Sequence, residues 1–266
     1  MKIRFIGGGA MATAIIAGMT QNHEDCDISV IEPLAQARTC LYGRFQDAVS
    51  VFASWSDAPE VTADNTRLIV LAVKPQQVKE AIQPLLSLAS PLPSMLSIVA
   101  GVRAETLSRL LGGAPSIIRA MPNTPALIGK GLTALYASPS VDVETRALVG
   151  KLMAQLGDVK WFNDQAMIDV MTALTGSGPG YVYYFMECIE NAARSFGITP
   201  DGARQVALSI TESAAQLAQR ESKTFAELRA QVTSKGGTTE AAICVLDQSN
   251  VKGAFFAAVT EAHRRA

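Results

Sequence analysis

Two stretches rich in glycine and hydroxyl residues have the spacing that a ligand-binding loop requires. In FIGGGAMATAI, Gly7, Gly9 and Ala12 form a G-x-G-x-x-A pattern between a short apolar run and a helical pattern. A tight turn, a close backbone approach and the free N–H groups of a helix start suit a dinucleotide pyrophosphate. The cofactor contacts predicted from this stretch are Ile6, Gly7, Gly8, Gly9, Ala10 and Met11.

An acidic residue, Glu32, ends the next apolar run, where a carboxylate can accept a hydrogen bond from a ribose 2′-hydroxyl. A 2′-phosphate would prefer Arg or Lys at that position, so Glu32 favours NAD over NADP. The alternative is that Glu32 is a solvated loop residue. Arg38 lies six residues further on, and the loop could direct it towards a 2′-phosphate, which would weaken the preference for NAD.

The runs LIVLAVKPQ and SIVAG should end at the same edge of a parallel sheet, where a nicotinamide would lie. Lys74 is interpreted either as a cation of the pocket or as a side chain that caps backbone carbonyls. The cofactor contacts predicted at these two strand ends are Ala72, Val73, Lys74, Pro75, Ala100 and Gly101.

The second stretch, TSKGGTTEAA, covers residues 233 to 242 and interrupts a region of helical patterns. A Gly-Gly turn allows a ligand to approach the backbone, and the helix start that follows offers unpaired amides to an anion. An ordinary helix cap explains the same Thr and Glu residues, and the segment alone does not separate the two interpretations.

The elements around these stretches change in type near residue 163. Up to that point short β-branched runs alternate with helical patterns, which favours a Rossmann-type, doubly wound parallel α/β sheet over residues 1–162. Helical spacing then dominates, and we predict an all-helical dimerisation domain over residues 163–266. Its predicted helices begin with the GPGYVYYFMECIENAARSFG stretch and continue over 200–220, 224–232, 238–247 and 252–265.

Composition excludes several classes of partner. The chain has 266 residues, a net charge of −1 and 48% hydrophobic residues, which is ample for a packed core. It has no run of Lys or Arg to attract nucleic acid or an anionic membrane, and no apolar run of the roughly 20 residues that span a bilayer. We therefore expect a cytoplasmic protein with a small-molecule partner.

The four cysteines and two histidines are not spaced as metal ligands. Cys26, Cys40, Cys188 and Cys244 are scattered and form no C-x-x-C motif; only Cys26 has a histidine close in sequence, His23. We expect buried or half-buried free thiols, no disulfide and no metal site.

Two further motifs narrow the interpretation of the glycine-rich stretches. RAMPNTPA at 119–126 and TGSGPGYVY at 175–183 occur in order with IGGGAMA, AVKP and TSKGGTTEAA. Together these motifs resemble pyrroline-5-carboxylate reductase over essentially the whole chain. The resemblance implies reduction of 1-pyrroline-5-carboxylate to L-proline, the last step of proline biosynthesis, with NADPH or NADH, by a homodimer or an assembly of dimers.

The resemblance also implies roles for the residues of the late loop. Ser234, Gly237 and Thr238 would bind the substrate carboxylate, largely through backbone groups, and the Thr239 hydroxyl would meet the ring nitrogen as the catalytic group. The family usually has proline where this chain has Lys235, which implies a less rigid and more positively charged loop. Whether NADPH or NADH is preferred stays open, since the family often prefers NADPH whereas Glu32 argues for NADH.

Two other functions remain as alternatives. A 3-hydroxyacid dehydrogenase would require a lysine four residues after the second glycine of a G-x-G helix start, but this chain has Val182 there, counted from Gly178. A non-catalytic dinucleotide sensor would keep the first glycines but would have no need of the threonine loop. Reduction of an iminium ion, by contrast, fits a chain with few histidines, because the substrate nitrogen already carries its proton.

Overall fold

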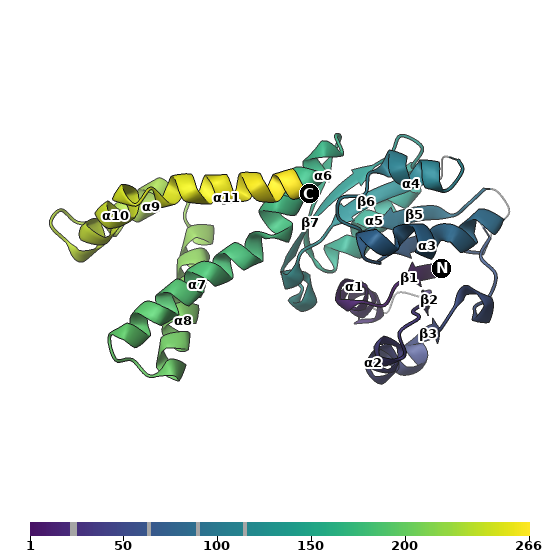
Figure 1. The fold of residues 1–266 in the computed structure, drawn as a ribbon, viewed down its shortest axis with the longest axis horizontal. Coiled ribbons are helices and arrows are strands. Elements are labelled where there is room, and N and C mark those ends of the chain that lie inside the picture. Colours follow the sequence, from purple (N-terminus) through teal and green to yellow (C-terminus); the bar gives the residue numbers. More distant parts are fainter. Residues whose placement is uncertain (22–25, 63–64, 89–90, 114–115) are drawn as a thin grey trace. The chain divides into compact units, whose positions relative to one another are not determined.

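The chain forms two compact units in a computed structural model that describes residues 1–21, 26–62, 65–88, 91–113 and 116–266 (Figure 1). The first unit comprises Met1–Ser177 together with His263–Ala266, and the second comprises Gly178–Ala262. The first unit is built on a sheet and the second on helices, as the change of pattern along the sequence predicts.

The sheet has eight strands in the order β3-β2-β1-β4-β5-β6-β7-β8. Neighbouring strands are parallel except β6 and β7, so the last two strands run against the first six. The Rossmann-type fold is confirmed, with an antiparallel step that the sequence did not reveal. The strands are β1 (Lys2–Ile6), β2 (Asp27–Ile31), β3 (Val49–Phe52), β4 (Leu68–Leu71), β5 (Ser94–Ser97), β6 (Ile117–Met121), β7 (Gly131–Ala137) and β8 (Gly157–Phe162).

Helices cover both faces of this sheet. Because side chains alternate along a strand, Ile3 and Phe5 enter one buried cluster with residues of α1, α2 and α5, whereas Ile6 enters another with residues of α3 and α4. The α-helices of this unit are α1 (Ala10–Gln21), α2 (Ala35–Phe45), α3 (Val78–Ile82), α4 (Ala104–Leu110), α5 (Val143–Ala154) and α6 (Ala166–Met171). Short 3-10 helices occupy Gln46–Ala48, Trp55–Asp57, Pro75–Gln77, Gln83–Ser87 and Thr124–Ile128, and a π-helical turn occupies Thr172–Gly176.

Three elements of the first unit do not stand out in the sequence. In α2 only Leu41 and Phe45 are buried, so the apolar spacing that marks a helix is weak. Strand β3 has only four residues and lies at the sheet edge, and α4 has only seven residues. Short elements leave too few residues to display a period.

Helix α6 lies in the first unit although it follows the boundary predicted at 162/163. Its Ile168 and Met171 pack on Ala134 of β7, and its Asp169 forms an ion pair of 2.9 Å with the buried Arg119 of β6. These contacts explain why the compact unit extends to Ser177, past the predicted boundary.

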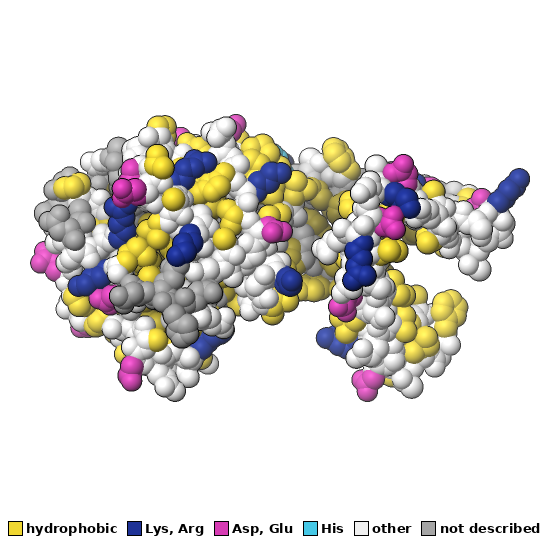
Figure 2. Space-filling view, turned by 180° about the vertical axis from the view of Figure 1, so that it is seen from behind, with side chains coloured by type: hydrophobic (Ala, Val, Ile, Leu, Met, Phe, Trp, Pro, Cys, Tyr) yellow, Lys and Arg dark blue, Asp and Glu magenta, His cyan; other side chains and the backbone are white. Residues whose placement is uncertain are grey.

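The helical unit buries few of its side chains within one chain. Only Ala193, Ala203 and Ala207 are buried among its described residues, and α9, α10 and α11 have no buried residue in the described structure. Figure 2 shows hydrophobic side chains on the surface of this unit. Its helices are α7 (Gly178–Ser195), α8 (Pro200–Arg220), α9 (Phe225–Gln231), α10 (Thr238–Gln248) and α11 (Val251–Arg265), close to the predicted bounds.

The burial predicted for the cysteines is wrong at three of the four positions. Cys26 is half-buried, but Cys40, Cys188 and Cys244 are exposed in the single chain. Cys188 and Cys244 lie on helices that leave most side chains exposed, so base rates of cysteine burial in closed cores do not transfer to them. None of the four cysteines forms a disulfide, and His23 lies outside the described residues.

The described part of the chain has neither a membrane-spanning helix nor a cluster of metal-ligating side chains. No helix there has the length and apolar character needed to cross a bilayer. Among the same residues, no three His, Cys, Asp or Glu side chains are grouped so that they could hold a metal ion.

Candidate cofactor and substrate sites

The predicted cofactor segments meet at the carboxyl edge of three adjacent parallel strands. The register pairs Ile6 of β1 with Leu71 of β4, and Leu71 with Ser97 of β5. The residues that follow these strands therefore lie at one edge of the sheet, which is where open α/β sheets bind ligands. The predicted contacts at Ile6–Met11, Ala72–Pro75 and Ala100–Gly101 all belong to these three segments.

The glycine loop after β1 has the space that a dinucleotide needs. Gly7 has φ +95°, and a Cβ there would lie 2.5 Å from the carbonyl oxygen of Ala72, so the turn excludes any side chain. At Gly8 a Cβ would meet Leu41. At Gly9 it would meet nothing within 4 Å, so the backbone is open to a ligand there.

Helix α1 starts directly after this open glycine. The N–H of Thr13 donates to the carbonyl of Gly9 at 2.9 Å, which leaves the N–H groups before it without partners inside the helix. These amides include those of Ala10 and Met11. The open backbone and the free amides fit the pyrophosphate of NAD or NADP.

Glu32 ends β2 beside the glycine loop, and both of its carboxylate oxygens are bound to backbone amides. The N–H of Gly8 donates to Oε2 at 2.7 Å, and the N–H of Leu34 donates to Oε1 at 2.9 Å. The residue is 7% exposed, so it is not the solvated glutamate that was the alternative. Arg38 does not pair with the carboxylate; its Nη1 donates to the carbonyls of Glu32 and Pro33 at 3.0 and 2.7 Å.

The described segments that follow β4 and β5 form backbone turns and contain no cluster of charged groups. Lys74 is exposed, and its carbonyl accepts a hydrogen bond of 2.9 Å from the N–H of Gln77 at the start of the helix that Pro75 opens. Gly101 has φ +70° and is exposed. The exposed Lys74 side chain leaves the interpretation as a pocket cation open.

The threonine loop lies in the helical unit and forms a tight turn before α10. Gly236 has φ +73°, and the N–H of Gly237 donates to the carbonyl of Ser234 at 3.0 Å. Helix α10 begins at Thr238, and the first amide with a partner inside the helix is that of Ala241, which donates to Gly237. The amides before it are positioned to bind an anion.

The side chains of this loop differ in exposure. Thr239 is half-buried, whereas Ser234, Lys235 and Thr238 are exposed. A Cβ on Gly237 would collide with the Ser234 side chain, so this glycine allows the turn to close tightly. The predicted substrate contacts Ser234, Gly237, Thr238 and Thr239 thus share one short segment.

Glu240, which the sequence places in the first turn of the helix, has a backbone partner that the sequence did not predict. The carboxylate of Glu240 accepts a hydrogen bond of 2.7 Å from the N–H of Gly236. Its position three residues after Gly237, which precedes the helix, matches the glutamate of a capping box. The capping hydrogen bond is therefore present, and it leaves the three amides at the start of α10 without a partner inside the helix.

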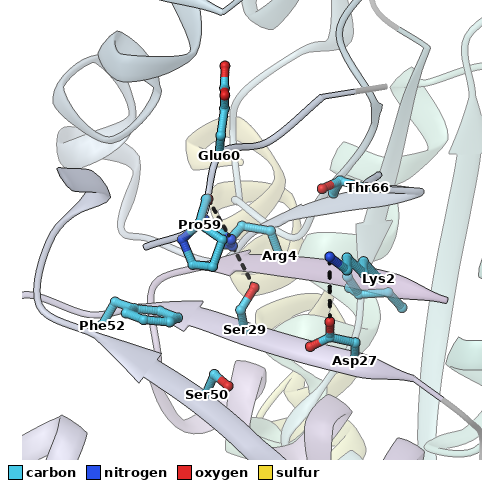
Figure 3. Close-up of a pocket in the computed structure, with 10 residues that line it drawn as sticks. Lys2, Arg4, Asp27, Ser29, Ser50, Phe52, Pro59, Glu60 and Thr66 are labelled. Atoms are coloured by element: carbon cyan, nitrogen blue, oxygen red, sulfur yellow. Dashed lines mark hydrogen bonds and ion pairs between the residues drawn. The ribbon is translucent and has the colours of Figure 1, made fainter. Parts of the chain in front are cut away.

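A small polar pocket lies at the other end of the sheet and is separate from the cofactor segments. It has a volume of about 50 Å³ and is lined by residues that include Lys2, Arg4, Asp27, Ser29 and Pro59 (Figure 3). Arg4 donates to Ser29 and to the Pro59 carbonyl, and burial lowers the pKa of its guanidinium, although the charge of Asp27 opposes this. Lys2 and Asp27 stand at the amino ends of β1 and β2, away from the glycine loop.

Two protein families match different parts of the chain. The family described as NADP oxidoreductase coenzyme F420-dependent matches residues 2–101. The family described as Pyrroline-5-carboxylate reductase dimerisation matches residues 165–266. The first match contains all the predicted cofactor contacts, and the second contains the threonine loop.

Individual relatives align over nearly the full chain. Pyrroline-5-carboxylate reductase of Pseudomonas aeruginosa is 37% identical over 91% of this chain and 87% of its own length. A solved pyrroline-5-carboxylate reductase of Coxiella burnetii has a TM-score of 0.84 and 33% identity, covering 99% of this chain and 96% of its own. A solved 1-pyrroline-5-carboxylate reductase of Streptococcus pyogenes has a TM-score of 0.87 and 26% identity, covering 100% and 97%.

Proposed function

The chain belongs to the pyrroline-5-carboxylate reductase family, and we propose that its two candidate sites serve the reaction of that family. It reduces 1-pyrroline-5-carboxylate to L-proline by hydride transfer from NADPH or NADH, the last step of proline biosynthesis. The observation that carries the assignment of residues is the turn at Gly236 and Gly237, followed by a helix start with three amides free of helix partners.

The amino-terminal site holds the cofactor. The open backbone at Gly9 and the amides at the start of α1 receive the pyrophosphate, and Glu32 receives the ribose. The segments Ala72–Pro75 and Ala100–Gly101 border the nicotinamide end. The bound cofactor supplies a hydride from C4 of its nicotinamide.

The threonine loop binds the carboxylate of the substrate. Orphan amides at Thr238 and Thr239 carry partial positive charge, and Gly237 keeps side chains away from the ligand. The exposed ammonium group of Lys235 adds a positive charge to this loop, at the position where the family usually has proline. Binding through fixed backbone donors orients the ring for hydride transfer.

Thr239 acts at the ring nitrogen. Its hydroxyl belongs to a half-buried residue at the start of α10, one position after the carboxylate-binding amide of Thr238. The substrate iminium already carries its proton, so Thr239 needs only to orient the nitrogen by a hydrogen bond. This role requires no histidine, and the described histidine, His263, lies in the last turn of α11.

The helical unit forms a homodimer, alone or within an assembly of dimers. Support comes from the many large hydrophobic side chains that α7–α11 expose in one chain, among them Tyr184, Val245 and Phe256 at 65%, 60% and 75%. Exposed apolar surface of this kind is typical of obligate interfaces. We place the reaction in the cytoplasm, where reduced nicotinamide cofactors are regenerated.

The test of the proposed function is the oxidation of NADH and NADPH on addition of 1-pyrroline-5-carboxylate, with the product identified as proline. Rapid loss of reduced cofactor in the wild type, and slow loss in Thr239→Ala with unchanged cofactor binding, would support the proposal. A folded protein that binds cofactor but oxidises neither form would instead favour the non-catalytic dinucleotide sensor.

A further inference from the structure

We infer that Glu32 makes this chain select NADH over NADPH, which rests on the proposed function and narrows it to one cofactor. Its carboxylate is not a mobile surface group. Each oxygen accepts one backbone N–H, from Gly8 at 2.7 Å and from Leu34 at 2.9 Å, and the residue is 7% exposed. Rotating the side chain away would break both charge-assisted hydrogen bonds.

The remaining hydrogen-bonding capacity of the carboxylate suits a hydroxyl and not a phosphate. Each carboxylate oxygen has two acceptor sites, so one remains on each oxygen after the backbone bonds are made. A ribose hydroxyl can donate to such a site. A 2′-phosphate has acceptor oxygens and negative charge, so it would meet Glu32 as a like charge beside the loop that must bind the pyrophosphate.

The cation nearest in sequence that could compensate for this repulsion is Arg38, which is attached to the same loop as Glu32. Between Glu32 and Arg38 the sequence has no Lys or Arg, so Arg38 is the first positive charge after β2. Its Nη1 donates to the carbonyls of Glu32 and Pro33, which attaches the guanidinium to the loop backbone. The remaining guanidinium N–H groups of Arg38 do not remove the obstacle, because a 2′-phosphate that met them would still lie beside the fixed carboxylate of Glu32.

The experiment measures the affinities of NAD⁺ and NADP⁺ by calorimetry and kcat/KM with NADH and NADPH, for the wild-type protein. We expect a preference of at least about 100-fold for the non-phosphorylated cofactor, both in affinity and in kcat/KM. This is the size of effect that an unpaired like charge at a binding site produces. Equal or tighter binding of NADP⁺ would overturn the inference. Oxidation of neither cofactor, together with selective NAD⁺ binding, would overturn the proposed function and leave the role of Glu32 intact.

Two variants separate the effect of the Glu32 charge on cofactor preference from the effect of Arg38. Glu32→Gln removes the charge but keeps the shape and one acceptor oxygen, so the NADH preference should fall at least tenfold. Arg38→Gln removes the cation, and it should change the two cofactor affinities by the same factor. A selective loss of NADPH binding in Arg38→Gln would show instead that Arg38 serves the 2′-phosphate, and would refute the inference.

The wild-type comparison keeps the test decisive if Glu32→Gln is unstable. Thermal unfolding of both variants shows which of them is folded at the assay temperature. The NAD⁺ to NADP⁺ affinity ratio of the wild type alone supports or contradicts the assignment, because it does not depend on a variant.

Discussion

The open space at Gly9 allows cofactor binding and folding to be perturbed separately. Gly9 has no left-handed φ, and a Cβ built on it meets no atom within 4 Å. Gly9→Ala should therefore fold. The residue directly precedes α1, where Ala is a poorer cap than Gly, but Ala also restricts the unfolded chain, and these effects oppose each other within about 1 kcal/mol.

The effect on cofactor affinity should be larger than the effect on folding. The new methyl group would occupy the space through which the pyrophosphate approaches the backbone and would displace it from the α1 amides. Because small displacements of a tightly positioned ligand cost one to two orders of magnitude, we expect a roughly 10- to 100-fold increase in Kd for NADH. Calorimetric titration measures this change, and thermal unfolding of the same sample measures stability.

Gly7→Ala is the matched control, since it adds the same methyl group two residues away. Its Cβ would lie 2.5 Å from the Ala72 carbonyl oxygen at φ +95°, so it should lower the free energy of unfolding by at least about 3 kcal/mol. If Gly9→Ala binds NADH like the wild type, the pyrophosphate does not approach Gly9 and the site is misplaced. If both variants are equally unstable, the space at Gly9 is not open in solution.

Three further changes test other parts of the molecule. Thr239→Ala should lower kcat roughly 100-fold and leave the NADH Kd unchanged, and Thr239→Ser should keep most activity; equal loss in both variants would exclude the hydroxyl as the acting group. Phe256→Asp, at a position 75% exposed in one chain, should convert the proposed dimer to monomers in light scattering, and an unchanged mass would place the interface elsewhere. Asp142 caps α5 by accepting the Thr145 N–H, and this bond lowers the pKa of its carboxyl. The stabilisation by this cap is therefore present above about pH 4 and is lost as the pH falls through the lowered pKa. Asp142→Ala should lower the free energy of unfolding by about 1 kcal/mol at pH 7 and by progressively less towards pH 3, as measured by denaturant titrations.

Prediction from the sequence is most accurate where the local geometry tolerates only one residue type. Gly7 has a left-handed φ and no room for a side chain, and glycine is the residue that tolerates both. The strand ends at Leu71 and Ser97 follow buried apolar runs, so their meeting at one edge follows from parallel pairing. Long helices such as α8, which has 21 residues, show their period clearly, and its predicted bounds of 200–220 are confirmed.

Contacts between distant residues could not be predicted in this way. The ion pair between Arg119 and Asp169 joins residues fifty positions apart, and it ties α6 to the sheet beyond the predicted boundary. The exposure of Cys188 and Cys244 also depends on how few neighbours the helical unit supplies within one chain, which helical spacing does not report. Periodicity states which side of a helix is apolar but not which surface covers it.

Both candidate sites place a carboxylate on a backbone amide of the loop that is to bind an anion. Glu32 accepts the N–H of Gly8 in the cofactor loop, and Glu240 accepts the N–H of Gly236 in the substrate loop, each at 2.7 Å. A glycine-rich turn is flexible in isolation, and a charge-assisted hydrogen bond from within the chain restricts it before any ligand binds. Each carboxylate also places a negative charge beside the proposed ligand, so the free amides at the helix start must supply the attraction for an anionic group. In the substrate loop Lys235 is an exposed cation next to Gly236 in the sequence, whereas Arg38 in the cofactor loop donates to carbonyls. Under the proposed function, the free amides of the substrate loop accept a carboxylate, while Glu32 disfavours an additional phosphate at the ribose end of the cofactor site.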